Sequence, residues 1–269
     1  MEQPHLKQEI KELYGAFAAT VNAQEAPAYS FCRKRYGQAE LSSVPPTALR
    51  LACGCGNPVS LTDIPPGCTV VDLGCGGGID VIIAARMAEH GKTLGIDLVP
   101  GMIRGAQQAV TESGLQQNIF FRVADIEDIS SLPRNFADVV LANCVINLCP
   151  DKLTVYRNIF RILKPGGVLV TSDPVLSEEI DLQLRERLQA TRTNCFSGAV
   201  SEKKHLQILK KLTLDIMETD SLTLTPEDLK TIARYPERDS ILPLSRDDLL
   251  SLQGKAGVMT VKAKRRPLN

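Results

Sequence analysis

The chain contains no tryptophan and only three histidines, His5, His90 and His205. So few histidines, widely spaced, exclude a histidine-rich metal site, and we expect His205 to lie on a helix surface rather than to bind a ligand. No pair of cysteines has the C-x-x-C spacing of a zinc ribbon. That absence argues against a structural zinc module.

Neither sign of charge is in excess, because 31 Lys and Arg balance 31 Asp and Glu. Balanced charge gives no indication of nucleic-acid binding, although residues 262–269 are locally basic. No apolar run approaches the roughly 20 residues of a membrane span. The polar N-terminus has none of the features of a secretory signal. We therefore predict a cytoplasmic protein that binds neither nucleic acid nor membranes.

Cysteine, in contrast, is abundant, with eight residues in the chain. In a reducing compartment these are not expected to form structural disulfides, which leaves buried inert thiols, metal ligands or reactive thiols. Two of them stand in identical tripeptides twenty residues apart, Gly54-Cys55-Gly56 and Gly74-Cys75-Gly76. Whether these tripeptides serve one purpose or two decides the interpretation of the protein.

Short apolar runs alternate with amphipathic segments between residues 69 and 175, and hydrophobic residues make up 43% of the chain. The runs are almost continuously apolar, as strands covered on both faces are, and their alternation with helices predicts a doubly wound, mostly parallel α/β sheet. We expect strands at 69–74, 92–98, 118–125, 136–144 and 168–173, with helices at 79–91, 99–114 and 150–167.

The regions on either side of this alternation have a different pattern. Residues 1–50 are predicted to form an N-terminal helical segment, because 5–18 have helical periodicity with Ile10, Leu13, Tyr14 and Phe17 on one face. Residues 51–175 form the predicted cofactor-binding domain. Residues 176–269 are predicted to form a C-terminal cap and closing strands, with helices at 177–192 and 201–211.

The second Gly-Cys-Gly lies in "VVDLGCGGGID", directly after an expected strand and before an expected helix. Glycine lets the backbone turn tightly and approach a ligand, and the helix N-terminus supplies free N–H groups. Asp97 ends the next strand, where it can accept hydrogen bonds from a ribose diol. The pattern predicts a nucleotide-containing cofactor, with Cys75 as a small filler between glycines.

Two cofactors suit this geometry. A dinucleotide needs its pyrophosphate at the helix N-terminus, whereas S-adenosyl-L-methionine has no phosphate and needs an acidic group near the start of the loop. Asp72 precedes the first glycine and Asp125 is placed to meet the adenine amine, so we predict S-adenosyl-L-methionine. Its predicted contacts are Asp72, Gly74, Cys75, Gly76, Gly78, Asp97, Leu98, Met102, Asp125, Ile126 and Asn143. With "LKPGG" before the fifth strand, residues 70–175 resemble class I S-adenosylmethionine-dependent methyltransferases.

The first Gly-Cys-Gly is followed by the turn signal Asn57-Pro58, and its cysteine is free to present sulfur to a site. Cys144 ends the fourth strand, at the edge of the sheet where ligands bind in doubly wound folds. Cys195 lies in the cap segment, which could fold over the crevice. Three thiols near a methyl donor suit a soft, thiophilic acceptor such as trivalent arsenic, whose lone pair can attack the sulfonium methyl.

The segments "GCGNP", "DLGCGGGIDV", "NCVINL", "LKPGG", "SD" and "C-x-x-GA" resemble the arsenite methyltransferase family over about residues 50–215. The resemblance implies a Rossmann-like, seven-stranded methyltransferase fold, arsenite detoxification, and a thiol reductant, glutathione or thioredoxin. It implies that Cys144 and Cys195 hold the arsenic while Cys55 takes part in a thiol relay. The chain departs from the family in lacking a cysteine within 22–31 and in having Asn194 before Cys195.

Two other functions remain open from the sequence. A methyltransferase acting on carbon, oxygen or another heteroatom of a small molecule would use Cys144 only for packing. A non-catalytic metalloid-binding protein would bind arsenite without turnover. We interpret Cys53, Cys68 and Cys149 as inert thiols, since free cysteine is among the most frequently buried residue types.

Overall fold

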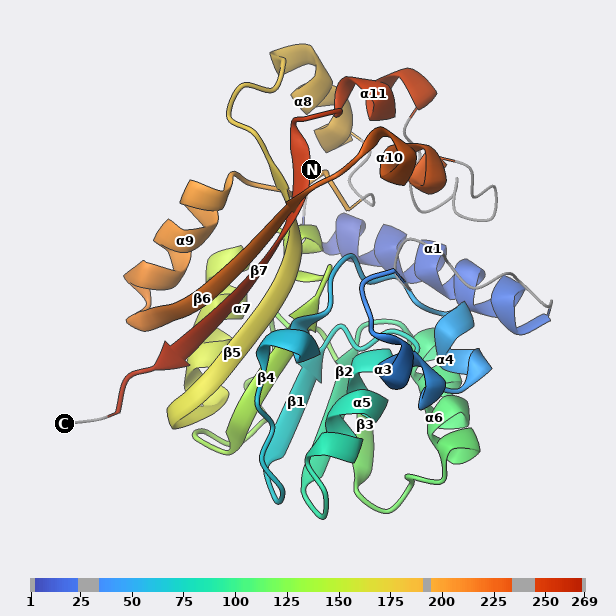
Figure 1. Ribbon diagram of the computed structural model, residues 1–269, viewed down its shortest axis with the longest axis vertical. Coiled ribbons are helices and arrows are strands. Elements are labelled where there is room, and N and C mark those ends of the chain that lie inside the picture. Colours follow the sequence, from blue (N-terminus) through green and yellow to red (C-terminus); the bar gives the residue numbers. More distant parts are fainter. Residues whose placement is uncertain (1–2, 24–33, 191–194, 234–244, 268–269) are drawn as a thin grey trace.

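A computed structural model describes residues 3–23, 34–190, 195–233 and 245–267 of the protein. Its centre is a seven-stranded sheet with the order β3-β2-β1-β4-β5-β7-β6 (Figure 1). The strands are β1 (Thr69–Leu73), β2 (Lys92–Asp97), β3 (Ile119–Val123), β4 (Ala137–Asn143), β5 (Leu163–Leu176), β6 (Leu214–Thr223) and β7 (Ala256–Arg265). β7 runs antiparallel to both of its neighbours, whereas the pairings among β1 to β5 are parallel. The predicted mostly parallel α/β fold is confirmed.

Helices cover both faces of this sheet. They are α1 (Gln3–Ala23), α3 (Gln38–Ser42), α4 (Pro46–Arg50), α5 (Ile79–Met87), α6 (Pro100–Ser113), α7 (Lys152–Ile162), α8 (Leu182–Ala190), α9 (Glu202–Lys211), α10 (Pro226–Ala233) and α11 (Arg246–Ser251), with short 3₁₀ turns η1 (Pro58–Leu61) and η2 (Ile146–Leu148). None of the helices in the described parts of the chain is both long enough and apolar enough to cross a membrane.

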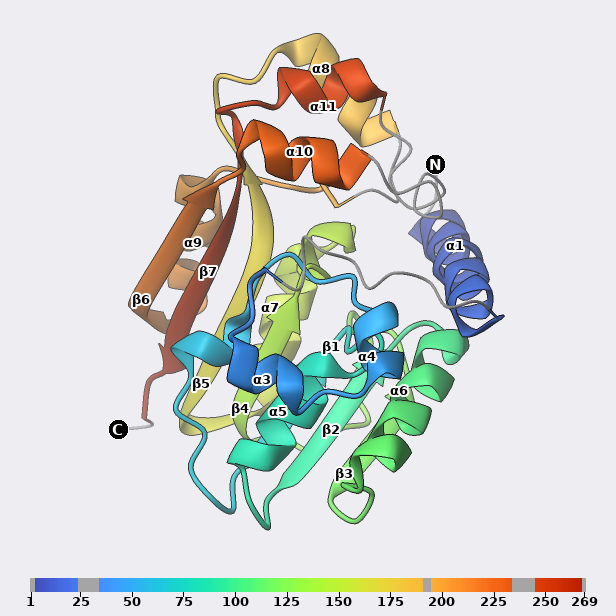
Figure 2. The same cartoon turned by 45° about the vertical axis from the view of Figure 1, so that its right-hand side comes forward.

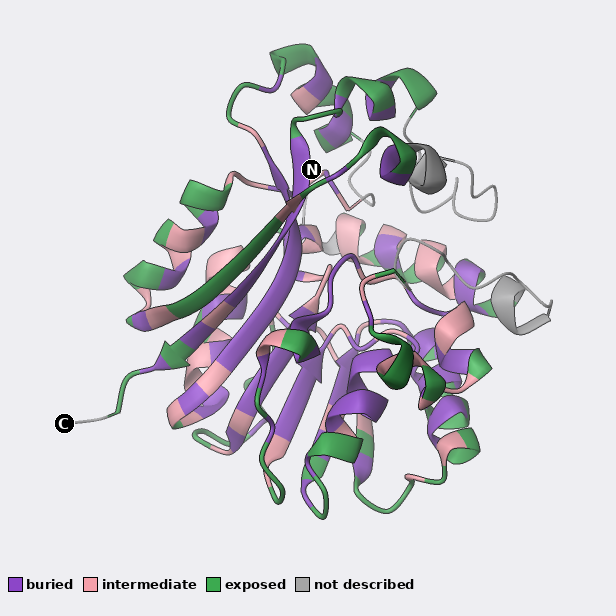
Figure 3. Cartoon of the chain, in the orientation of Figure 1, coloured by how far each residue is buried: buried purple, intermediate pink, exposed green. Residues whose placement is uncertain are grey.

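Alternate residues of the central strands enter two separate cores. In β4, Val139 and Leu141 pack into a cluster that includes residues of α5 and α6, whereas Val140 and Ala142 pack into one that includes residues of α7. Both faces are therefore dry, which explains why these strands are almost continuously apolar in sequence. Figure 3 shows the central strands buried along most of their length, while the edge strand β6 is mainly exposed.

The carboxyl ends of the parallel strands lie level with one another. Leu73 at the end of β1 pairs with both Ile96 and Ala142, and Asn143 at the end of β4 pairs with Ser172. Strand order reverses at β1, since β2 and β4 flank it, and ligands of doubly wound sheets bind at such a reversal. Figure 2 shows α8, α10 and α11 grouped beyond this end of the sheet.

Two predicted helix ends are wrong. The helix predicted to close at Gly91 ends at Met87, because Glu89 and His90, rather than the glycine, take the left-handed conformation. The helix predicted to be stopped by Pro165-Gly166-Gly167 ends earlier, at Ile162, because Leu163 is already extended and begins β5 two residues before Pro165. The helix predicted to end at Gly114 does so, with that glycine left-handed at φ 72°.

The prediction that His205 lies on a helix surface is also wrong. Its side chain is 4% exposed, and its Nε2 lies 3.0 Å from the hydroxyl of the buried Tyr156 on α7. Burial, and to a lesser extent the charge of Lys152, lowers the pKa of His205 to about 4. The helical pattern of α9 identified the helix, but could not indicate that an imidazole on its inner face had a hydroxyl partner.

The boundaries proposed at residues 50 and 175 stay a prediction. β5 continues across the second boundary to Leu176, where it pairs with Ala256 at the start of β7. In the C-terminal region, the Arg187 guanidinium on α8 lies 2.7 Å from the carboxylate of Asp248 on α11. This region therefore shares the sheet of the central region while carrying helices of its own.

Because the sheet is buried on both faces, a leucine-to-alanine substitution should destabilise the protein far more on a central strand than at an exposed position. Leu141→Ala removes a fully buried side chain on β4 and should lower the free energy of unfolding by about 2–5 kcal/mol. Leu182→Ala removes a side chain that is 69% exposed and should change it by less than about 0.5 kcal/mol. Urea unfolding followed by circular dichroism measures both. Equal effects would contradict the burial assigned to β4.

Candidate functional site

A cavity of about 1010 Å³, including its open mouth, lies at the carboxyl ends of β1, β2 and β4. Nine of the predicted cofactor contacts line it: Gly74, Cys75, Gly76, Asp97, Leu98, Met102, Asp125, Ile126 and Asn143. Asp72 and Gly78 do not line the cavity; Asp72 is buried at the end of β1, and Gly78 caps α5.

The loop between β1 and α5 needs glycine for its backbone conformation. Gly74, Gly76 and Gly78 all have positive φ, at 70°, 50° and 87°, where other residues are strained. The N–H groups of Gly74 and Cys75 both donate to the carbonyl of Ile96, which fixes the loop to β2. A Cβ on Gly74 would also overlap the side chain of Val145, so this loop packs closely against the segment that follows β4.

Three buried carboxylates surround this loop. Asp97 accepts hydrogen bonds from the N–H groups of Gly76 and Val99, each at 2.9 Å. Burial, reinforced by the charges of Asp80 and Asp97, raises the pKa of Asp72 well above its ordinary value. Burial also raises the pKa of Asp80 to about 6. A positively charged ligand nearby favours the ionised form of a buried carboxyl, so the residues present fit a cationic nucleoside such as S-adenosyl-L-methionine.

Helix α1 contributes to the cavity in a way that sequence reasoning missed. Lys7, Ile10 and Tyr14 line it, and the Lys7 Nζ lies 2.6 Å from Asp125 and also pairs with Glu127. The 3.6-residue periodicity of α1 identified its apolar face but not the surface that this face covers. The predicted adenine contact Asp125 is therefore at the cavity, with its carboxylate already paired to α1.

The loop that carries Cys55 needs its glycines for a different reason. Neither Gly54 nor Gly56 is among the described residues with positive φ. A Cβ on Gly54 would lie 2.5 Å from the Asn143 amide nitrogen, and one on Gly56 would lie 2.6 Å from the Cβ of Ser172. The two tripeptides are thus distinct: one bends around a cavity, and the other presses against the ends of β4 and β5.

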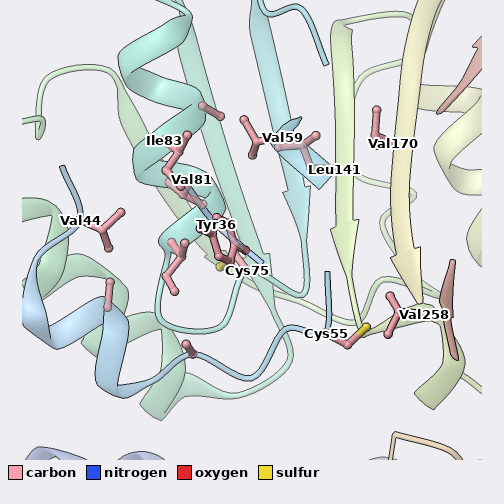
Figure 4. Packing of buried hydrophobic residues seen from close by; sticks show 14 of the residues in the cluster. Tyr36, Val44, Cys55, Val59, Cys75, Val81, Ile83, Leu141, Val170 and Val258 are labelled. Carbon is pink, nitrogen blue, oxygen red and sulfur yellow. The ribbon is translucent and has the colours of Figure 1, made fainter. Parts of the chain in front are cut away.

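Their two cysteines are correspondingly far apart. In Figure 4, Cys55 lies on the side of Val258 of β7, well separated from Cys75. Cys75 is buried at the loop that lines the cavity, and burial raises the pKa of its thiol well above the ordinary value. A neutral, buried thiol agrees with the interpretation of Cys75 as a filler.

Asn143 holds the Cys55 loop in place. Its Oδ1 accepts hydrogen bonds from the N–H groups of Cys55 and Gly56, at 3.0 and 3.2 Å. Its Nδ2 lies 3.0 Å from each of three oxygens, the Gly56 carbonyl, the Tyr36 hydroxyl and the Asp80 carboxylate. Asn143 was predicted as a cofactor contact; it lines the cavity, but both ends of its amide are engaged by protein groups.

The Cys144 thiol interacts with the other two predicted thiols, since both Cys55 and Cys195 lie close enough to shift its pKa. One carbonyl also joins the first two segments, since the Ser172 oxygen accepts from the Cys144 N–H at 2.7 Å and from the Cys55 thiol at 3.7 Å. Cys144 itself is left-handed, with φ 59°, an uncommon conformation for a residue other than glycine and one often found at functional sites.

The three sulfurs do not form a finished metal site. In the described parts of the chain, no group of three His, Cys, Asp or Glu side chains is arranged around a common point as metal ligands are. All three cysteines are present as thiols rather than as disulfides. They are therefore adjacent in pairs through Cys144, and a common ligand would have to draw them together.

The groups around the Cys144 thiol shift its pKa in both directions. Interaction with the Cys195 thiol lowers the pKa of the Cys144 thiol, whereas interaction with the Cys55 thiol, burial and the negative charge of Asp173 together raise it by more. The result is a pKa well above the ordinary value. The central thiol is protonated at neutral pH.

Of the other described cysteines, two line the cavity and one lies away from it. Cys53 and Cys149 line the cavity, and the Cys149 thiol donates to the Val145 carbonyl at 3.6 Å. Cys68 lies just before β1, away from the cavity, and burial raises the pKa of its thiol. Cys32 and Asn194 lie outside the described residues. The interpretation of Cys53, Cys68 and Cys149 as inert stays a prediction.

Comparison with known proteins adds independent information. A family model described as a methyltransferase domain matches residues 64–213. The chain is 33% identical over 184 residues to an arsenite methyltransferase of Halobacterium salinarum, which covers 67% of this chain and 44% of that protein. It spans about half the length of the curated relatives it matches. These relatives confirm the resemblance that the motifs predicted.

Solved structures agree on the fold. CrArsM, an arsenic (III) S-adenosylmethionine methyltransferase from Chlamydomonas reinhardtii, matches with a TM-score of 0.63 and 26% identity, covering 90% of this chain and 75% of that one. The [4+2]-cyclase SpnF matches with a TM-score of 0.67 and 18% identity, covering 98% of this chain and 97% of its own. The second likeness shows the fold alone.

The raised pKa of Cys144 predicts slow alkylation. At pH 7.5, iodoacetamide should modify Cys144 in the folded protein at least about tenfold more slowly than in the urea-unfolded protein, because only the thiolate reacts. The rate should keep rising about tenfold per pH unit through pH 9, since the thiol is still far from fully ionised. Peptide mass spectrometry measures the rate at each cysteine. A rate that levels off below pH 8 would contradict the assigned protonation.

Proposed function

The chain belongs to the methyltransferase domain family, and on this premise we propose that it methylates trivalent arsenic held by Cys55, Cys144 and Cys195. The observation that carries the proposal is the interaction of the Cys144 thiol with the other two, beside a cavity that Cys144 itself lines and that suits S-adenosyl-L-methionine. Similarity to curated arsenite methyltransferases supports it. A cytoplasmic location and a role in arsenite detoxification belong to the same proposal.

Protonated thiols suit the loading of the substrate. Arsenous acid carries three hydroxyl groups, and its condensation with three thiols forms three As–S bonds while releasing three water molecules. No net proton is taken up or released in that exchange, so the raised pKa of Cys144 does not oppose it. Thiolate sulfur is the soft ligand that a thiophilic centre prefers.

The cavity provides the donor site. S-adenosyl-L-methionine supplies an electrophilic methyl group on a positively charged sulfonium. The buried carboxyls of Asp72, Asp80 and Asp97 favour a cation there, since an opposite charge offsets the cost of keeping them ionised out of water. The apolar lining from Ile10 and Met102 limits the access of water. Catalysis is then mainly a matter of holding the reacting atoms at about 3–3.5 Å in a dry pocket.

The thiols that bind arsenic can return the two electrons that arsenic gives up when it is methylated. With the donor bound, the arsenic lone pair would form the As–C bond as the bond between sulfonium and methyl broke, which would raise arsenic from a formal +3 to +5. If two thiolate ligands then join as a disulfide, two electrons return to arsenic, and water fills the vacated position with loss of one proton. A thiol reductant, glutathione or thioredoxin, would reopen the disulfide by exchange.

Incubation with arsenite, a thiol reductant and methyl-labelled S-adenosyl-L-methionine tests the function. We expect labelled methylarsenicals, identified by mass spectrometry, from the unchanged protein. Cys144→Ser should reduce their formation by at least about 100-fold, because oxygen replaces the central soft ligand. Cys68→Ser changes a thiol remote from the cavity and serves as the matched control, with unchanged product.

Calorimetric titration with S-adenosyl-L-methionine measures donor affinity and so distinguishes loss of the thiol from loss of the fold. Donor affinity should be the same in both variants, so that a loss of product in Cys144→Ser reports the thiol and not the fold. Turnover that survives Cys144→Ser and Cys195→Ser together would favour a methyltransferase for another small molecule. Arsenite binding with no donor affinity would favour a metalloid-binding protein without catalysis.

A further inference from the structure

We propose that Asn143 and Asn147 are positioning residues that place the two outer thiols around Cys144. Asn143 precedes the central cysteine and holds the loop of Cys55, while Asn147 follows it and holds the main chain of Cys195. The inference rests on the proposed function for its purpose, although the placement itself involves no arsenic. One five-residue segment, "NCVIN", would then assemble the whole thiol cluster.

The Asn143 amide matches the loop group for group. The loop offers two N–H donors, from Cys55 and Gly56, which Oδ1 accepts, and one carbonyl acceptor, from Gly56, to which Nδ2 donates. Only an amide supplies a donor and an acceptor in this arrangement. The Tyr36 hydroxyl donates to Asp80 at 2.9 Å, and both lie against the same amide, which fixes its orientation.

Gly54 allows the Cys55 loop to lie directly against the Asn143 side chain. With a Cβ on Gly54, the loop could not approach the Asn143 side chain, since the two would be 2.5 Å apart. Cys55 is 5% exposed, and its thiol reaches Cys144 only because the loop lies this close to the end of β4. Asn143 therefore acts on the outer thiol through the loop backbone rather than by touching the sulfur.

Asn147 performs the corresponding task on the cap side. Its side chain is 4% exposed, and its Nδ2 donates to the carbonyl oxygen of Cys195. Its own carbonyl accepts from the Lys152 Nζ at 3.0 Å, and its N–H donates to Asp173 at 3.3 Å. Its main chain is thus fixed by Asp173 of β5 and by Lys152 at the start of α7.

The turn after Cys195 fits tightly against Asn147. A Cβ on Gly198 would overlap the Asn147 carbonyl oxygen and would lie 2.8 Å from the Lys152 Nζ. The turn can therefore dock on η2 only with glycine at that position. This contact explains the "C-x-x-GA" pattern: the cysteine presents its thiol to Cys144, while the glycine three residues later lets the turn pack against Asn147.

Substitution of each asparagine by leucine, which has a similar shape but no polar group, separates the two tasks. In Asn147→Leu the Cys195 segment loses its anchor, and in Asn143→Leu the Cys55 loop loses its anchor. Asn118→Ala, an exposed position at the edge of the sheet, is the control. Because loss of buried hydrogen bonds can impair folding, Asn143→Ser and Asn147→Ser provide a second pair that keeps a polar group.

The first readout needs no arsenic. Mild oxidation with diamide, followed by peptide mapping, should give Cys144–Cys195 and Cys55–Cys144 disulfides in the unchanged protein. Asn147→Leu should lower the yield of the first by about tenfold and leave the second intact, since one buried hydrogen bond is worth roughly that factor. Asn143→Leu should show the opposite pattern. A role in general stability alone would lower both disulfides together.

The second readout is protection of each cysteine from iodoacetamide by arsenite. Cys195 should lose protection in Asn147→Leu and Cys55 in Asn143→Leu, with S-adenosyl-L-methionine affinity within twofold of normal for Asn147→Leu, whose side chain does not line the cavity. If both variants keep both disulfides and full protection, the positioning roles are wrong. If the unchanged protein forms both disulfides but gains no protection from arsenite, the proposed function fails while the positioning roles stand.

Discussion

The close contact between the Cys55 loop and the carboxyl ends of β4 and β5 is the constraint on which the site depends. Gly54 approaches the Asn143 amide, and Gly56 approaches Ser172, to distances that any side chain would prevent. The sheet in turn fixes both partners, because Asn143 and Ser172 are paired in register on adjacent parallel strands. A loop remote in sequence thereby gains the rigidity of the central sheet, and so does the thiol that it carries.

The same end of the sheet carries both the cofactor loop and the loop after β4 that contains Cys144. Gly74 of the cofactor loop packs against Val145, the residue after Cys144, so a displacement of either loop would displace the other. On one side of this contact lie buried carboxyls that favour a cation, and on the other lies the Cys144 thiol, whose raised pKa favours its neutral form and so a neutral, thiophilic substrate. This division suits transfer from a sulfonium to arsenic, since neither half of the site competes for the ligand of the other.

The sequence was sufficient to predict the sheet, its alternation with helices and the cofactor loop, because each depends on local patterns. Apolar runs specify buried strands, and glycines with positive φ specify the loop after β1. Cys144 could also be placed, since the carboxyl end of a strand has a known position in such a fold. The first Gly-Cys-Gly could be distinguished from the second by its lack of a flanking strand, but the reason for its glycines could not.

Contacts between distant segments were beyond sequence reasoning. Asn143 was assigned to the cofactor because it lies at the carboxyl end of the fourth strand, whereas its amide is held by a loop 87 residues earlier in the chain. His205 was placed on a surface because nothing local indicates its hydroxyl partner, 49 residues away on α7. The ion pair between Lys7 and Asp125 is of the same kind. In each case the partner depends on how the helices dock, and helical periodicity does not determine docking.

X-ray absorption at the arsenic edge, recorded on the arsenite complex of the unchanged protein, tests the central claim most directly. Convergence of the three thiols on one arsenic atom predicts a first shell of three sulfur atoms and no oxygen. Replacement of any one of Cys55, Cys144 or Cys195 by serine should reduce the sulfur count from three to two. A first shell dominated by oxygen in the unchanged protein, or a sulfur count indifferent to these substitutions, would contradict the account.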